Sequence, residues 1–240
     1  MCRLFAVYAN EPVRVHRAFA AMRSQSHEHK DGWGVFTFDQ GPKLETCTDS
    51  AYRSERFREL GQTMQAQTLL AHIRLASVGA VSAPNSHPFF DEGWAFQHNG
   101  TVRGFAQSRE RLESLLSPER RSRIKGDTDS ERCFQLFLSR VKGEEPKQVA
   151  AALASVIRDV SAIFDEPGTK PSSMNFIAFN GRQLVATRHG RELHLLSRPN
   201  ARMISSEALW HDEPWEMLPE DSAIAIEPSL SVTRWALSEL

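Results

Sequence analysis

The sequence has few cysteines, a net charge close to zero and no long hydrophobic run. Its three cysteines are an odd number without paired spacing, which argues against a disulfide framework and predicts a protein of the reducing cytoplasm. The formal charge of −1 gives no electrostatic reason to expect nucleic acid or a membrane as a partner. The longest apolar stretch, near Val149–Ile157, is too short to span a bilayer and indicates a helix.

Internal repeats, low-complexity segments and Pro/Gly-rich linkers are also absent. A chain of 240 residues can bury a substantial core, and without a linker we expect one domain over residues 1–240. The nine histidines, among them His27 and His29, raise the question of a zinc site. Neither a His-Glu-x-x-His pattern nor a Cys-x-x-Cys pair occurs, so we expect no metal and no other cofactor.

Hydrophobic periodicity predicts strands towards both ends of the chain and helices between them. Strands are expected at Met1–Tyr8, Trp33–Phe38, Leu69–Leu75, Trp94–Gln97, Met174–Phe179, Gln183–Thr187, Leu193–Ser197, Met203–Ser206, Ile224–Ile226 and Leu230–Leu237. Helices are expected at Val13–Met22, Ser108–Leu116, Ser130–Val141 and Lys147–Phe164. Asn180-Gly181 is typical of a hairpin turn with both residues at positive φ. This order predicts an α+β fold in which two packed sheets are covered by helices.

Cys2 stands directly before a strand-like apolar run, and this position suggests a nucleophile. Removal of Met1 would leave one residue carrying both a thiol and a free α-amine. A thiol has an ordinary pKa near ~8.5 and reacts as the thiolate, whereas an α-amine with a pKa near ~7.7–8.0 is partly a free base at neutral pH. One residue would then supply both nucleophile and base. A small buried residue that opens a strand is the structural alternative.

Polar residues follow two predicted strands at the point where each strand ends. The side-chain amide of Asn99 and a backbone N–H near Gly100 could together form an oxyanion hole, although Asn-Gly at a strand end is commonly just a turn. His98 alone is more typical of a structural histidine. His72 and Arg74 face the same side of their strand, where the planar guanidinium of Arg74 would suit a carboxylate. A surface arginine is the alternative.

The segment Gly126–Glu131 precedes an apolar helix. Thr128 or Asp129 as the N-cap, with Glu131 as the capping-box acid, accounts for most of this pattern. A carboxylate fixed at a helix N-terminus could also receive a substrate ammonium group.

The remaining polar and cysteine-bearing segments are interpreted structurally. The basic run at 120–125 is expected to be a solvated loop offset by acids near Glu207–Asp221, with docking of an anionic partner as the alternative. Cys47 in a predicted strand and Cys133 on an apolar helical face are expected to be structural.

Together these segments resemble the class II glutamine amidotransferases, a family of N-terminal-nucleophile hydrolases. The matching stretches, in the order and spacing of the family, are Met1-Cys2, Asp31-Gly32-Trp33-Gly34, His72-x-Arg74, Asn85-x-His87-Pro88, His98-Asn99-Gly100 and Thr128-Asp129-Ser130-Glu131. The later half resembles stand-alone family members down to Ser205-Ser206-Glu207 and Glu213-Pro214-Trp215. The implied fold is a four-layer αββα sandwich.

The resemblance implies a role for each matching residue. Cys2, freed of Met1, is implied as the nucleophile on the side-chain carbonyl of glutamine, with its own amine as general base. Asn99 and Gly100 are implied as the oxyanion donors, Arg74 as the clamp on the α-carboxylate and Asp129 as the acceptor of the α-ammonium. A thioester would form, ammonia would leave, and water would release glutamate.

The chain departs from the family in two ways. Multidomain members carry Arg-Trp-Ala-Thr-His-Gly where this chain has the stretch 74–79, Arg-Leu-Ala-Ser-Val-Gly. Ser77 keeps the hydroxyl expected for substrate binding, whereas Leu75 and Val78 replace the tryptophan and histidine of a loop that closes over glutamine. The chain also ends at 240, without a synthase domain to consume ammonia.

Three functional hypotheses follow. The first is a stand-alone glutaminase or amidotransferase that releases ammonia from L-glutamine, with a separate synthase as the ammonia-accepting partner. The second keeps the chemistry but takes a γ-glutamyl amide of a small metabolite, as in ergothioneine assembly. The third is a non-catalytic binding or regulatory module that retains the pocket.

Overall fold

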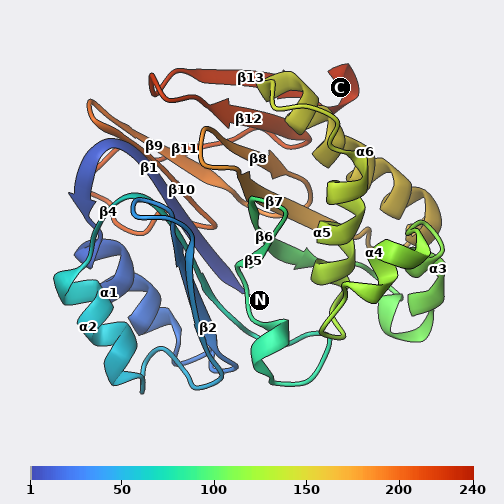
Figure 1. Ribbon diagram of the computed structural model, residues 1–240, viewed down its shortest axis with the longest axis horizontal. Coiled ribbons are helices and arrows are strands. Elements are labelled where there is room, and N and C mark those ends of the chain that lie inside the picture. Colours follow the sequence, from blue (N-terminus) through green and yellow to red (C-terminus); the bar gives the residue numbers. More distant parts are fainter. Residues whose placement is uncertain (1) are drawn as a thin grey trace.

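The computed structural model describes residues 2–240, so the expected removal of Met1 concerns a residue outside the described part. Two antiparallel sheets dominate the fold (Figure 1). The first, in strand order β11-β9-β10-β1-β4-β2-β3, comprises β1 (Arg3–Arg14), β2 (Trp33–Thr37), β3 (Lys43–Cys47), β4 (Gln65–Ile73), β9 (His194–Arg198), β10 (Ala201–Ser205) and β11 (Glu216–Met217). The second, in the order β13-β12-β8-β7-β6-β5, comprises β5 (Phe89–Asp91), β6 (Trp94–Thr101), β7 (Ser173–Phe179), β8 (Leu184–Arg188), β12 (Ser222–Ile226) and β13 (Val232–Ala236).

Helices cover the outer face of each sheet (Figure 1). They are α1 (His16–Gln25), α2 (Glu55–Thr63), α3 (Arg109–Glu113), α4 (Pro118–Ser122), α5 (Asp129–Arg140) and α6 (Pro146–Phe164), with single 3₁₀ turns at Ala83–Asn85, Phe105–Gln107 and Leu237–Glu239. The pair α1 and α2 packs on the first sheet, whereas α5 and α6 pack on the second. The layer order is therefore helix, sheet, sheet, helix, which confirms the predicted α+β sandwich.

Three hydrophobic cores separate the four layers, and the alternation of β1 shows how the sequence specifies them. Phe5 and Val7 pack in the core beneath α1 and α2, whereas Leu4 and Ala6 pack in the core between the two sheets. Successive side chains of a strand point to opposite faces, so a strand that is apolar at every position belongs in an inner layer. Each fully buried phenylalanine, valine or leucine side chain stabilises the fold by about 1.5–3 kcal/mol relative to exposure.

Strand β1 is longer than its sequence predicts. The range Val13–Met22 was expected to be helical, but Val13 and Arg14 belong to β1 and pair with Ala66 and Gln65 of β4 after an irregularity in the register. Helix α1 begins only at His16. The prediction failed here because strand pairing across the sheet overrode a local apolar pattern that also suits a helix.

The turn at Asn180-Gly181 forms a hairpin of a different type from the one expected. Strand β7 ends at Phe179 and β8 begins at Leu184, so four residues connect the strands rather than the three left between the predicted strands. Of the pair, only Gly181 has a positive φ, +89°. The side-chain Oδ1 of Asn180 accepts hydrogen bonds from the backbone N–H groups of Arg182 and Gln183, at 3.1 Å each. These hydrogen bonds stabilise the turn although Asn180 does not have the positive φ that was predicted.

The basic run is also not the loop that was expected. Arg120 and Arg121 lie in α4, and Ser117 caps this short helix by accepting a hydrogen bond from the Arg120 N–H. The offsetting acids are Glu92, paired with Arg120 at 2.8 Å, and Asp91, paired with Arg123 at 3.0 Å, rather than the acids near 207–221. The acids come from β5 and from the turn after it, which the sequence did not place beside α4.

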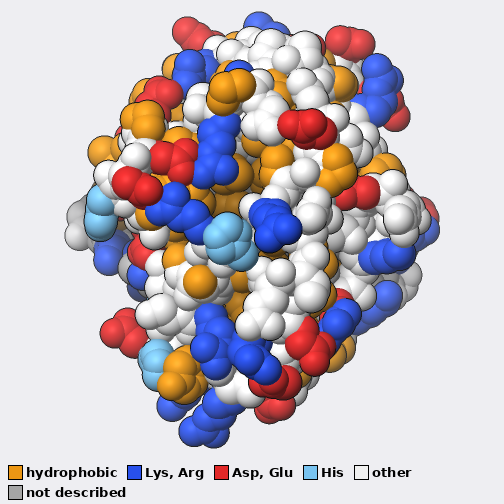
Figure 2. All heavy atoms as spheres, turned by 90° about the vertical axis from the view of Figure 1, so that its left-hand side faces the viewer, with side chains coloured by type: hydrophobic (Ala, Val, Ile, Leu, Met, Phe, Trp, Pro, Cys, Tyr) orange, Lys and Arg blue, Asp and Glu red, His pale blue; other side chains and the backbone are white. Residues whose placement is uncertain are grey.

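The surface carries charges of both signs. Seen from the side of α1 and α2, Lys and Arg side chains are interspersed with Asp and Glu side chains, and apolar side chains line a hollow at the centre of the view (Figure 2). Among the helices of residues 2–240, none has the length and apolar character that crossing a membrane requires.

Candidate active site

Cys2 immediately precedes β1 in the first sheet and faces the end of β6 in the second. Its Sγ lies 3.5 Å from both the backbone nitrogen and the carbonyl oxygen of Leu75, just beyond the end of β4. The thiol lines a cavity of about 120 Å³. The other residues lining this cavity are Leu75, Ala76, Ser77, Asn99, Gly100, Thr101 and Arg191. Of the predicted site residues, Ser77, Asn99 and Gly100 thus line the same cavity as the thiol, whereas Arg74 and Asp129 do not.

The surroundings of Cys2 act on its ionisation in opposite directions. Burial raises the pKa of the thiol above its ordinary value, as does the negative charge of Asp129. The contact with the Leu75 backbone and the positive charge of Arg74 act to lower the pKa. Because burial is the largest of these effects, the thiolate needs help from a base or from the bound substrate.

Asn99 and Gly100 are not in a turn, contrary to the commonest interpretation of Asn-Gly. Both lie within β6, opposite Asn175 and Met174 of β7. The side-chain amide of Asn99 makes no hydrogen bond to another described residue, so its N–H groups are free to donate to a ligand in the cavity. A Cβ on Gly100 would lie 1.8 Å from the Ser173 carbonyl oxygen, so glycine is required there for the two strands to approach.

Arg74 is buried and its guanidinium contacts a backbone loop. Nη1 donates to the carbonyl of Ala80 at 2.9 Å, and Nη2 donates to those of Val78 and Gly79 at 3.0 and 3.3 Å. The surface alternative for this arginine is therefore wrong. The side chain holds the 78–80 loop in place, and its charge acts on Cys2.

Asp129 is buried at the N-terminus of α5, one residue after the N-cap Thr128. Its Oδ2 accepts a hydrogen bond from the Val102 N–H at 2.8 Å, and Oδ1 accepts one from the Ser130 N–H at 2.8 Å. The carboxylate is thus fixed beneath the end of β6. Glu131 does not complete the expected capping box, because its carboxylate instead accepts hydrogen bonds from the backbone N–H groups of Lys125 and Gly126.

Two further side chains of the motifs fix the loops around the cavity. The Asp31 carboxylate accepts a hydrogen bond from the Ala76 N–H at 2.8 Å. Asn85 donates to the Ala80 carbonyl at 2.9 Å and is bonded on both sides of its amide to Asp127. These contacts join the segments around 31, 76–85 and 127 into one rim.

Two lining residues, Thr101 and Arg191, were missed from the sequence. The Thr101 hydroxyl lies 3.2 Å from that of Ser77, so the two hydroxyls meet at the cavity. Arg191 lies between β8 and β9, more than ninety positions beyond the Asn99-Gly100 pair in the chain and outside every motif. Thr101 follows the Asn99-Gly100 pair directly and could have been included on that ground, whereas no local signal distinguishes Arg191.

Besides His29, three histidines of the described residues are buried: His72 in β4, His87 just before β5 and His98 in β6. The rings of His72 and His87 are 4.3 Å apart between centroids. His98 is a satisfied structural histidine, as expected, since Nε2 contacts the Ser173 carbonyl at 3.0 Å and Nδ1 contacts the Ser130 hydroxyl at 2.9 Å. A carbonyl only accepts, so Nε2 carries the proton in the neutral ring.

The buried histidines predict a loss of stability in weak acid. Burial, assisted by the charge of Arg74, lowers the pKa of His72 to about 3, and burial also lowers the pKa values of His87 and His98. Unfolding lets these rings take up protons, so stability is full above the unfolded pKa near ~6.5 and falls as the pH drops towards the folded value. His72 alone is expected to remove about 1 kcal/mol between pH 6 and pH 5. Urea unfolding at pH 7, 6 and 5 measures this slope.

The matched variants are His72→Leu, which should flatten the slope, and His211→Leu at an exposed position, which should leave it unchanged. A slope that is the same in all three proteins would contradict the assignment.

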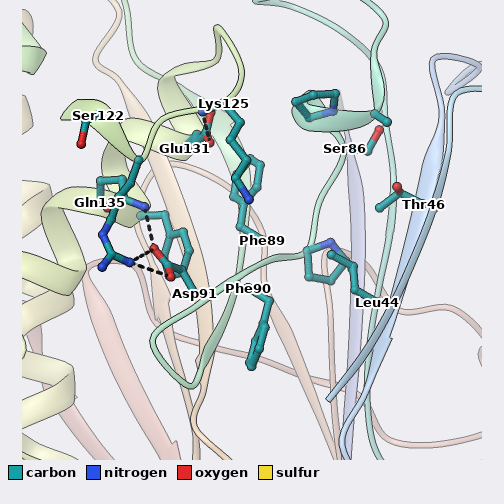
Figure 3. A pocket seen from close by; sticks show the side chains of 15 residues that line it. Leu44, Thr46, Ser86, Phe89, Phe90, Asp91, Ser122, Lys125, Glu131 and Gln135 are labelled. Carbon is teal, nitrogen blue, oxygen red and sulfur yellow. Dashed lines mark hydrogen bonds and ion pairs between the residues drawn. The ribbon is translucent and has the colours of Figure 1, made fainter. Parts of the chain in front are cut away.

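A larger cavity of about 320 Å³ lies between β3, β5 and α5 (Figure 3). Lys125 extends into it beside Phe89, and Asp91 is joined to Arg123 and Gln135 along one wall. This cavity contains no cysteine or other activated nucleophile, so its lining does not provide the chemistry of the Cys2 site.

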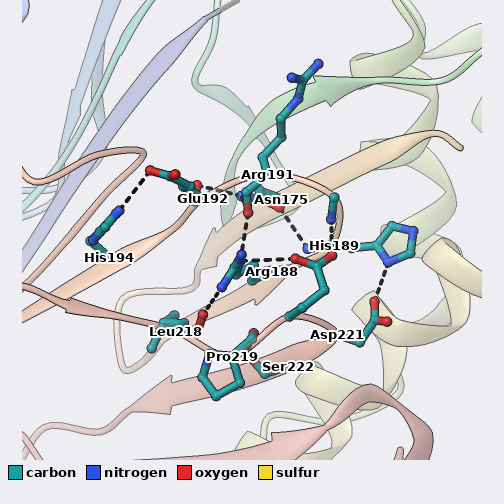
Figure 4. Close-up of polar contacts among 12 residues, drawn as sticks. Asn175, Arg188, His189, Arg191, Glu192, His194, Leu218, Pro219, Asp221 and Ser222 are labelled. Carbon is teal, nitrogen blue, oxygen red and sulfur yellow. Dashed lines mark hydrogen bonds and ion pairs between the residues drawn. The ribbon is translucent and has the colours of Figure 1, made fainter. Parts of the chain in front are cut away.

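His189, Glu220 and Asp221 offer ligand atoms within 4.8 Å of one another. His189 Nδ1 is bonded to Asp221 at 2.6 Å, and Glu220 pairs with Arg188 at 3.2 Å (Figure 4). Arg188 thus pairs with Glu220 and His189 with Asp221, so each carboxylate of this cluster already has a partner within the protein.

A family model described as class-II glutamine amidotransferases matches residues 1–203. The chain is 26% identical over 227 residues to a probable glutamine amidotransferase of Saccharomyces cerevisiae, a match that covers 79% of this chain and 64% of the relative. This chain therefore spans less than two thirds of that relative. It is 29% identical over 206 residues to the gamma-glutamyl-hercynylcysteine sulfoxide hydrolase of Mycolicibacterium smegmatis, covering 83% and 80% of the two chains.

Solved structures share the fold. A glutamine aminotransferase class-II domain protein from Silicibacter pomeroyi superposes with a TM-score of 0.72 at 21% identity, over 98% of this chain and 99% of that one. The glutamine phosphoribosylpyrophosphate amidotransferase of B. subtilis superposes with a TM-score of 0.70 at 14% identity, over 100% of this chain and 50% of that one. At these identities the likeness concerns the fold.

Proposed function

Since the chain belongs to the class II glutamine amidotransferases, we propose that it hydrolyses the side-chain amide of a γ-glutamyl group, in the simplest case L-glutamine, through a thioester on Cys2. The protein is an enzyme of the amidohydrolase type. The observation that carries the residue assignment is the meeting of the Cys2 thiol and the unbonded Asn99 amide in one small cavity.

The proposed reaction has two steps. The sulfur of Cys2 attacks the amide carbon, the C–N bond breaks with the proton passing to the leaving nitrogen, and a C–S bond forms. Water then adds to the thioester, the C–S bond breaks, and glutamate leaves with the thiol restored. The Asn99 amide and the Gly100 backbone donate to the oxygen that becomes negative in each tetrahedral intermediate.

The proposed base is the α-amine of Cys2, which requires that Met1 be removed. Burial raises the pKa of the thiol, so a base on the same residue that accepts its proton as attack begins would meet the need for activation. Active enzyme is expected to begin at Cys2, and the intact mass of the active fraction measures this. Full activity in protein that retains Met1 would contradict the proposal.

Arg74, Ser77 and Asp129 are proposed to bind the glutamyl end. Asp129 is a buried carboxylate suited to an α-ammonium group, and the Ser77 hydroxyl lines the cavity. Arg74 holds the 78–80 loop and is proposed to clamp the α-carboxylate as well. Leu75 and Val78 replace the tryptophan and histidine that multidomain members carry in this loop. We therefore do not extend the loop closure of those enzymes to this chain.

The test is to trap the acyl-enzyme. The protein is mixed with L-glutamine, quenched in acid within milliseconds and digested, and peptide mass spectrometry is expected to find one glutamyl group on the peptide containing Cys2. A thioester is stable in acid and is cleaved by hydroxylamine, so loss of the added mass on hydroxylamine treatment identifies the bond. The mechanism would be refuted if glutamate is released but no acylated Cys2 is found under conditions in which acylation is at least as fast as deacylation.

A second candidate keeps the mechanism and changes the leaving group. The Mycolicibacterium smegmatis relative is named as a hydrolase of a γ-glutamyl compound, and Arg191 adds a cation to the cavity that ammonia release would not use. For the first candidate we propose a separate synthase as the acceptor of the ammonia. The relative kcat/KM of glutamine and of other γ-glutamyl amides separates the two candidates.

A further inference from the structure

Arg191 is a cation in the Cys2 cavity that the glutamyl end does not require. Its side chain extends away from the polar contacts around Arg188, as Figure 4 shows. Its Nε donates to the Ser173 hydroxyl at 3.1 Å. Among residues 2–240 no carboxylate forms an ion pair with it, and the rest of its five donors are available to a ligand.

The backbone around Arg191 is held rigidly. Asn175 donates to the carbonyl oxygens of Arg191 and Glu192 at 3.1 and 3.0 Å and accepts from the His189 N–H at 2.8 Å. Arg188 also donates to the Arg191 carbonyl at 2.9 Å. A side chain on such a fixed backbone is pre-organised, which lowers the entropic cost of binding a ligand.

The guanidinium groups of Arg191 and Arg74 contact different segments of the chain. The Ser173 hydroxyl that it contacts also accepts from the Thr101 N–H at 3.2 Å, so Arg191 lies over the pairing of β6 with β7. Arg74 instead follows β4 in the first sheet and points to the 78–80 loop. Arg191 lines the cavity together with the thiol and Asn99, whereas Arg74 is bonded to the 78–80 loop, so we take the two arginines to serve different ends of a bound substrate.

A second arginine adds to the positive charge on this side. Burial lowers the pKa of Arg191, and the positive charge of Arg103, which is exposed just beyond β6, lowers it further. Two like charges without a paired acid repel each other, and a bound anion would relieve that repulsion. Ammonia, the leaving group from glutamine, offers no such anion.

We infer that Arg191 forms a carboxylate subsite for the leaving group, so that the preferred substrates are γ-glutamyl amides of amino acids rather than glutamine. This inference rests on the proposed function, because it takes the cleaved bond to be the γ-glutamyl amide. In a γ-glutamyl amino acid the carboxylate lies two bonds beyond the cleaved nitrogen, within reach of a guanidinium that lines the same small cavity. The products are glutamate and the free amino acid.

The experiment uses two substrates that differ only in the charged group. γ-Glutamylglycine carries a carboxylate where γ-glutamylethylamide carries a methyl group. The wild-type enzyme is expected to show a kcat/KM at least about tenfold higher for γ-glutamylglycine, as a charge-assisted bidentate contact implies. Arg191→Gln should reduce that ratio to about one by lowering only the γ-glutamylglycine value, and Arg191→Lys should restore part of it.

The control is Arg182→Gln, which removes the same charge at an exposed position of the β7–β8 turn and should leave both values unchanged. Equal wild-type values for the two substrates would overturn the inference. So would an Arg191→Gln variant that loses activity on both equally, because Arg191 would then serve the glutamyl end.

A binding measurement separates this inference from the proposed function. In a Cys2→Ala background, which cannot turn over, calorimetry with the two compounds should show the same roughly tenfold preference, and Arg191→Gln should remove it. If the wild type hydrolyses neither compound nor glutamine, the proposed function fails, and the binding ratio alone then decides whether the subsite exists. If the Cys2→Ala protein that retains Arg191 binds the two compounds with equal affinity, the subsite does not exist and the inference is overturned.

Discussion

Replacing Cys2 by alanine is expected to reduce glutamate release from every γ-glutamyl substrate by at least about 10³-fold, because the sulfur that forms the thioester is lost. The remaining groups of the cavity still bind the substrate, so Kd should change little while kcat falls. Glutamate release measured with an enzyme-coupled assay, together with calorimetric binding, gives both quantities.

The Cys2→Ala variant should fold normally, which makes the loss of activity interpretable. Among residues 2–240, the Cys2 sulfur makes two hydrogen bonds, both at 3.5 Å to the backbone of Leu75, and the residue is only half-buried. Cys47→Ala is the matched control, because Cys47 is also a half-buried free cysteine but lies in β3, outside the lining of the cavity. Equal activities of the two variants would reject Cys2 as the nucleophile.

Replacing Asn99 by alanine is expected to lower kcat by about 10²–10³-fold, the usual cost of losing one oxyanion donor. The amide of Asn99 has no partner among the described residues, so its removal leaves no buried group unsatisfied and the fold should persist. The negative charge that Asn99 is proposed to stabilise exists only in the tetrahedral intermediates. KM should therefore change much less than kcat.

Asn200→Ala provides the control for this second prediction, since Asn200 lies between β9 and β10 and bonds to Glu11 at the surface. Single-turnover kinetics separate acylation from deacylation, and both should slow in Asn99→Ala because the same oxyanion forms in each. If KM rises tenfold or more while kcat is unchanged, Asn99 binds the ground state and the assignment to the oxyanion hole is wrong.

Much of the fold could be predicted because it depends on neighbours in the chain. The helix start at Thr128, the buried face around Cys133 and the two-sided burial of β1 each follow from patterns within about ten residues. The boundary errors arise where a partner strand decides, as at Val13. Helix α2 was missed because its apolar pattern is short: Phe57 and Leu60 are its only large buried side chains.

The candidate site was predicted through its motifs, with roles that remain proposals. Cys2, Ser77, Asn99 and Gly100 line one cavity, whereas Arg74 and Asp129 are not among its lining residues. The sequence could not show that Arg74 holds the 78–80 loop, since that contact depends on how the chain turns back after β4.

The sequence by itself determined which faces are buried in the strands and helices that it predicted, because side-chain period and hydrophobicity are local properties. The four-layer arrangement was implied by the resemblance to the family. Only the tertiary structure decided that Arg191 reaches the thiol of Cys2, 189 positions earlier in the chain. The reason is physical: that proximity results from packing the two sheets face to face and pairing β6 with β7, and no pattern near Arg191 encodes either contact.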